Sequence, residues 1–199
     1  MIAVKGCKVN TITNGIIDNG IVLIEDGKIK EIGGDVHVPD GVKIIKAKYV
    51  MPGLVEAHCH IGIWEEKIGW AGSDGNERTE PATPHVRALD GIKANADEGG
   101  LKAALHEGIT TAQVLPGSAN VIGGHGVALK TAPKTTVDEM LIRNPSGMKI
   151  AFGENPMRVY GVEAKKMPST RMGVAGVLRE WLQKSPPRQM HIPPKLRAE

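Results

Sequence analysis

The sequence predicts an α/β protein in which a β-rich segment precedes a longer stretch of alternating strands and helices. Up to about Met51, short runs rich in β-branched residues follow one another between turn residues, with few strong helix formers among them. After Pro52-Gly53, apolar runs typical of strands alternate with runs typical of helices, which is the pattern of parallel βα units. The hydrophobic share of 41% suffices for a buried core.

Composition excludes several classes of function. The 25 Lys and Arg residues against 22 Asp and Glu residues leave a net charge of +3, which gives no reason to expect a nucleic-acid or membrane partner. No run approaches the roughly 20 unbroken apolar residues of a membrane-spanning helix. The two cysteines, Cys7 and Cys59, lie far apart and the N-terminus has no signal-peptide pattern, so we expect free thiols and a cytoplasmic location.

The β-rich segment comprises residues 1–51. We expect its strands at residues 2–4, 9–12, 21–25, 28–32 and 42–45. Asp26-Gly27 lies between the third and the fourth of these strands. Asp-Gly readily adopts the positive φ angles of a two-residue turn, so the pair predicts a tight β-hairpin.

Residues 52–184 form the second segment. We expect its strands at residues 54–61, 109–115, 121–129 and 148–152, and a helix-like stretch at 84–107. A last helix is expected over 170–184, with Ser169 or Thr170 as its N-cap and with Ala175, Leu178 and Leu182 on its apolar face. Residues 185–199 contain four of the 13 prolines and predict an irregular tail.

The strongest chemical signal lies near the end of the first strand of this second segment. Residues two apart on a strand point to the same side, so Glu56, His58 and His60 share one face. Two imidazoles on that face can bind one divalent ion such as zinc. With 7 histidines in the chain a chance His-x-His pair is common, but the β-rich lead-in, the Pro-Gly pair and the apolar run favour a metal site.

Four stretches of the chain resemble the amidohydrolase superfamily, in particular its imidazolonepropionase-like, metal-dependent hydrolases: residues 33–34, 51–60, 108–111 and 153–156. The resemblance implies the N-terminal part of a composite β-sandwich followed by a (β/α)8 TIM-type barrel. It also implies one or two divalent metal ions, with zinc expected, that activate water against a C–N bond of a small-molecule substrate. Glu56 stands where the family usually has Asp, and the longer acid can still orient a ligand histidine.

The resemblance further implies a third metal ligand from a later strand, either a glutamate or a carboxylated lysine. Glu154 and Lys149 are the candidates. If residues 148–152 form the strand, Lys149 lies about 16 Å deeper than Glu154 at about 3.3 Å per residue, too deep for a site at the mouth of the barrel. We therefore expect His58, His60 and Glu154 as the ligands, with Lys149 as the alternative. His125, in a glycine-rich loop, is as consistent with substrate contact as with a solvated position.

Length limits what the chain can form. A complete barrel takes about 250 residues, or roughly 31 per βα unit, whereas residues 52–184 number 133. The resemblance therefore covers the N-terminal half of a family member and implies about half a barrel. The later strands, which in the family carry two more ligand histidines and an aspartate general base, have no counterpart, so the catalytic base is unknown. A half barrel leaves an open sheet edge, so we expect a homo-oligomer or completion by another chain.

Two functional hypotheses follow. The first is a metal-dependent hydrolase of amides, cyclic amides or related C–N bonds, in truncated form. The second is a catalytically silent metal-binding or assembly fragment of such an enzyme. Metal-dependent turnover distinguishes them.

Overall fold

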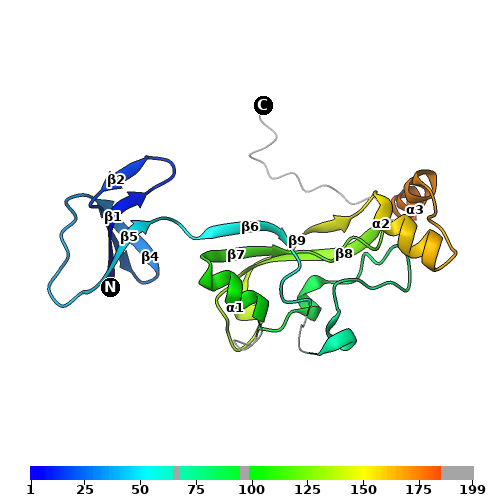
Figure 1. Ribbon diagram of the computed structural model, residues 1–199, viewed down its shortest axis with the longest axis horizontal. Helices are drawn as coiled ribbons and strands as arrows, with labels where there is room; N and C mark the ends of the chain where they lie inside the picture. The colour runs from blue at the N-terminus through cyan, green and yellow to red at the C-terminus, as the bar shows by residue number, and fades with distance from the viewer. Residues whose placement is uncertain (65–67, 95–98, 185–199) are drawn as a thin grey trace. The chain divides into compact units, whose positions relative to one another are not determined.

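The computed structural model describes residues 1–64, 68–94 and 99–184 (Figure 1). The chain divides into two compact units, Met1–Gly53 and Leu54–Glu199. Among the described residues, each unit contains one β-sheet, and the helices belong to the second unit. The protein is thus mixed α/β and rich in strands, as predicted in outline. The predicted tail at 185–199 lies outside the described residues, and none of the described helices is long and apolar enough to cross a membrane.

The first unit is a five-stranded sheet in the order β2-β1-β3-β4, with β5 also paired to β1. Its strands are β1 (Ile2–Asn10), β2 (Ile16–Asp18), β3 (Ile21–Glu25), β4 (Lys28–Gly33) and β5 (Lys43–Val50). The hairpin prediction is confirmed, because Glu25 pairs with Lys28 and the φ angles of Asp26 and Gly27 are 50° and 73°. A partner sheet for a composite sandwich stays a prediction.

The prediction of two separate strands before residue 13 is wrong. β1 is one continuous strand whose parallel register with β5 runs from Ile2 opposite Lys43 to Val9 opposite Val50. Main-chain pairing with β5 therefore keeps the chain in the strand conformation between residues 4 and 9, where the sequence is mostly polar. Ala3 and Leu23 are buried in the small core of this unit together with Val36.

The second unit holds a four-stranded sheet in the order β6-β7-β8-β9. Its strands are β6 (Leu54–Cys59), β7 (Ile109–Val114), β8 (Ile122–Lys130) and β9 (Leu141–Ile150). β6 and β7 are parallel, and α1 (Gly99–His106) lies between them in the chain and packs against β7 (Figure 1). β8, however, is antiparallel to both β7 and β9.

The expected succession of parallel βα units is therefore wrong for β8 and β9. Only residues 115–121 and 131–140 connect these strands to their predecessors, fewer than the dozen or so that a parallel crossover requires. The glycine-rich stretch around His125, expected to be a loop, lies within β8. The half barrel stays a prediction.

Shorter helices complete the second unit. They are η1 (Gly69–Gly72), η2 (Ala88–Gly91), η3 (Asp138–Met140), α2 (Glu154–Met157) and the π-helix η4 (Arg158–Glu163). The stretch 84–107 contains η2 and α1 rather than one long helix.

The last helix, α3 (Arg171–Lys184), confirms the prediction, since the Thr170 hydroxyl accepts a hydrogen bond from the Gly173 N–H at 3.1 Å. Its buried face was predicted only in part. Leu178 packs against the core together with the buried Val174 and Val177, as expected, whereas Ala175 and Leu182 are exposed. The reason is tertiary, because the helix packs into a cluster with Val121 and Ile122, which selects a neighbouring stripe of the helix.

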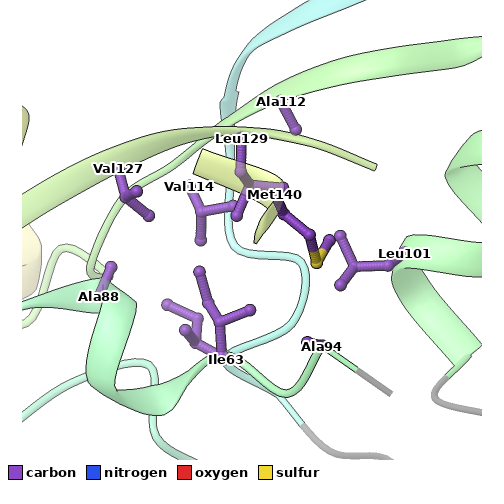
Figure 2. Close-up of a cluster of buried hydrophobic side chains, with 10 residues drawn as sticks. Ile63, Ala88, Ala94, Leu101, Ala112, Val114, Val127, Leu129 and Met140 are labelled. Atoms are coloured by element: carbon purple, nitrogen blue, oxygen red, sulfur yellow. The ribbon is translucent and has the colours of Figure 1, made fainter. Parts of the chain in front are cut away.

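The main core fixes the ends of β6 and β7 (Figure 2). Side chains from β7, β8, α1 and the loop after β6 meet there, and the cluster includes Ile63, Leu101, Val114, Leu129 and Met140. Each of these is at most 1% exposed. Cys59 and Ile61 pack against the same cluster from the end of β6, so this strand end is held by the main core.

Candidate metal centre

His58 and His60 lie at the C-terminal end of β6. His58 is the penultimate residue of the strand and His60 follows its last residue, Cys59. Their ring centroids are 5.5 Å apart and the ring planes are perpendicular. The alternation of the strand thus brings both imidazoles together, as the i, i+2 spacing predicts.

The His60 ring is held by the main chain of the neighbouring strand. Its Nδ1 lies 2.7 Å from the carbonyl oxygen of Leu115, to which it donates a hydrogen bond. The Leu115 N–H in turn donates to the Cys59 carbonyl at 3.0 Å, which continues the pairing of β6 with β7 beyond the end of β7. With Nδ1 protonated, Nε2 of His60 keeps its lone pair for a ligand.

Lys149 completes the cluster. Its Nζ lies 3.2 Å from Nε2 of His58, and the residue is only 8% exposed. The sequence argument that placed Lys149 too deep is wrong, because β9 ends at Ile150. Lys149 is therefore the penultimate residue of β9, as His58 is of β6, and both lie at the ends of strands that run in the same direction.

Glu154 lies apart from this cluster in the structure. It is the first residue of α2, beyond the end of β9, and it is exposed. Within residues 1–64, 68–94 and 99–184, no group of three or more His, Cys, Asp or Glu side chains is placed to hold a metal ion. The grouping that the structure does form consists of two imidazoles and an amine. The feature of the sequence that points to this grouping is Lys149, the single lysine in the otherwise apolar run 148–152.

The surroundings shift Lys149 and His58 towards their neutral forms. Burial lowers the pKa of Lys149. The pKa of His58 is lowered first by the positive charge of Lys149, then by burial and by His60, while Glu56 opposes the shift. A neutral imidazole is the form that binds a metal ion, and a neutral amine is the form that reacts as a nucleophile.

Glu56 supports His58 through the main chain. Its Oε1 accepts a hydrogen bond from the His58 N–H at 2.9 Å. The role expected from the sequence was an acceptor for a ligand histidine, and the contact made here is to the backbone and not to the ring.

No protein-family model matches the chain. The chain is 33% identical over 170 residues to amidohydrolase tasK of Hapsidospora irregularis, an alignment that covers 77% of this chain and 17% of that protein. It is also 50% identical over 52 residues to a dihydroorotase of Acetivibrio thermocellus, covering 26% of this chain and 12% of the relative.

A solved structure shares the fold. The crystal structure of an amidohydrolase from Thermotoga maritima MSB8 aligns with a TM-score of 0.84 at 43% sequence identity. The alignment covers 92% of this chain and 47% of that one. The chain therefore spans less than half the length of each of these proteins.

Proposed function

Because the chain belongs to the amidohydrolase superfamily, we propose that it supplies the metal-binding part of a hydrolase that cleaves C–N bonds in amides or cyclic amides. The observation that carries the proposal is the convergence of His58, His60 and Lys149 at the ends of β6 and β9. The amidohydrolase and dihydroorotase names of the relatives support this reaction class. We propose a cytoplasmic location, since Cys7 and Cys59 are both free thiols.

The donor atoms suit a divalent cation such as zinc. Nitrogen ligands lie about 2.0–2.1 Å from zinc, so two of them are within about 4 Å of each other. The ring centroids of His58 and His60 are 5.5 Å apart, and Nε2 of His60 keeps its lone pair because Nδ1 is bonded to Leu115. We propose His58 and His60 as ligands of one or two ions.

Lys149 is the third ligand that this geometry favours, in place of Glu154. The superfamily resemblance implies a carboxylated lysine or a glutamate at this position. The lone pair of a neutral Lys149 amine can form an N–C bond to carbon dioxide, and loss of one amine proton to solvent leaves an anionic carbamate with two oxygen donors. A buried amine with a lowered pKa is suited to that step. Glu154 remains the alternative.

The residues of this chain hold the metal ligands in place and orient them. A bound metal ion would lower the pKa of water and polarise the scissile carbonyl. The Leu115 carbonyl fixes the tautomer of His60, and Glu56 tethers the main chain at His58. The general base that the resemblance implies, an aspartate of a later strand, is not assigned to any residue of this chain.

Completion of the sheet is part of the proposal. β6 and β9 are the outer strands of the second sheet, and they carry the exposed apolar side chains Leu54, Val55 and Ile142. We propose that a second copy or another chain covers them.

The test is zinc binding by isothermal titration in bicarbonate buffer, with Lys149→Ala and Glu154→Ala as a matched pair. The proposal expects Lys149→Ala to lose affinity by at least the factor of about 10–100 that removal of a ligand-orienting residue costs, and Glu154→Ala to match the wild type. Equal affinity in the wild type and Lys149→Ala would refute Lys149 as a ligand. Zinc-dependent amide hydrolysis by the assembled protein would support the hydrolase, and stoichiometric zinc without turnover would favour the assembly fragment.

A further inference from the structure

Gly123 on β8 borders the side chain of Lys149. A Cβ atom added at Gly123 would lie 3.3 Å from Cγ of Lys149, 3.4 Å from the Gly117 carbonyl oxygen and 3.5 Å from Cβ of Pro116. Gly123 is buried, and its φ lies outside the left-handed region. A side chain at Gly123 is therefore restricted by the space around Lys149 and not by backbone conformation.

On the side opposite Lys149, the loop with Pro116 and Gly117 is held in place by hydrogen bonds. The Gly117 N–H donates to the Gly75 carbonyl at 2.6 Å, and the Ala119 N–H donates to Oδ1 of Asn76 at 2.9 Å. These bonds hold the loop that contains Pro116 and Gly117. A side chain at Gly123 would consequently displace the Lys149 side chain, which is the more adaptable neighbour.

We propose that Gly123 is a positioning residue, whose missing side chain lets Lys149 extend across β8 to reach His58. Lys149 is anchored to β9 at its Cα and meets His58 Nε2 at its far end. A shift of a few tenths of an ångström at Cγ is passed on to Nζ. The proposal deepens the proposed function, because it concerns how one ligand of the same site is placed.

The test compares Gly123→Ala and Gly123→Val with Gly147→Ala. Gly147 lies on the neighbouring strand β9, and a Cβ there would meet only Nε2 of Gln113, at 3.9 Å. The first readout is the ¹⁵N resonance of His58 Nε2 in metal-free protein at one fixed pH. The second is zinc affinity measured by titration.

Gly123→Ala is expected to shift the His58 resonance and to weaken zinc binding about tenfold, with a larger loss in Gly123→Val and wild-type behaviour in Gly147→Ala. Wild-type resonance and affinity in Gly123→Ala would overturn the proposal. If Gly123→Val unfolds, Gly123→Ala still tests the proposal, because its closest new contact, at 3.3 Å, requires only a small shift of the Lys149 side chain. A shifted His58 resonance in Gly123→Ala, with no zinc binding even by the wild type, would support the positioning role and refute the proposed function.

Discussion

Replacement of Tyr160 by Phe should destabilise the second unit by about 1 kcal/mol at neutral pH. The Tyr160 ring is fully buried, and its hydroxyl donates a hydrogen bond to the Glu80 carbonyl at 2.7 Å. A net hydrogen bond contributes about 0.5–1.5 kcal/mol. We expect the middle of that range, because the Glu80 carbonyl keeps a second hydrogen bond, at 3.1 Å, from Nδ2 of Asn120 when the hydroxyl is removed.

The same substitution should alter the dependence of stability on pH. Burial, reinforced by the negative charges of Glu80 and Glu77, raises the pKa of Tyr160 to about 12, against about 10 in an unfolded chain. Between these values the folded protein keeps a proton that the unfolded chain has lost, so the contribution of Tyr160 is complete below about pH 10 and is lost as the pH rises towards 12. The phenyl ring of the Tyr160→Phe variant has no proton to lose in this range.

Urea unfolding of the two proteins, followed by circular dichroism at several pH values, measures the effect. All other groups are common to both proteins, so the stability advantage of the wild type should shrink by about 1 kcal/mol between about pH 9 and pH 11. An advantage that stays constant over this range would refute the argument from burial. Equal stability at neutral pH would refute the hydrogen-bond argument.

Three further predictions concern other parts of the chain. At about pH 8, an exposed Cys7 should react rapidly with a thiol reagent and Cys59 slowly, because burial raises the pKa of Cys59; a Cys7→Ser variant that kept the fast phase would contradict this. Lys149→Met should raise the pKa of His58 in an NMR titration, since the Lys149 charge is the main cause of its lowering, and an unchanged pKa would refute that cause. Val174→Ala should cost about 1–2 kcal/mol in urea unfolding and Leu182→Ala under about 0.5 kcal/mol; equal costs would show that the buried face of α3 is assigned wrongly.

Local chemistry made parts of the fold predictable. Asp26-Gly27 specifies its hairpin through the φ angles that these two residues adopt readily. The alternation of β6 places His58 and His60 together because His58 lies near the end of the strand and His60 follows its last residue, Cys59. Such features depend on neighbours in the sequence and need no knowledge of the tertiary structure.

Features that depend on long-range pairing were not predictable in this way. The directions of β8 and β9 follow from which strands they pair with, and a run of apolar residues carries no such information. The position of Lys149 depends on where β9 ends, which its pairing with β8 decides. The buried stripe of α3 likewise depends on the cluster at Val121 and Ile122, and not on the helix alone.

Zinc content per chain, measured by elemental analysis of the purified protein and of its His58→Ala/His60→Ala variant, tests the central claim most directly. The account predicts one or two equivalents of zinc in the wild type and none in the variant, with both proteins folded by circular dichroism. A folded wild type without metal, or a variant that retains its full zinc content, would contradict the assignment of these histidines as metal ligands.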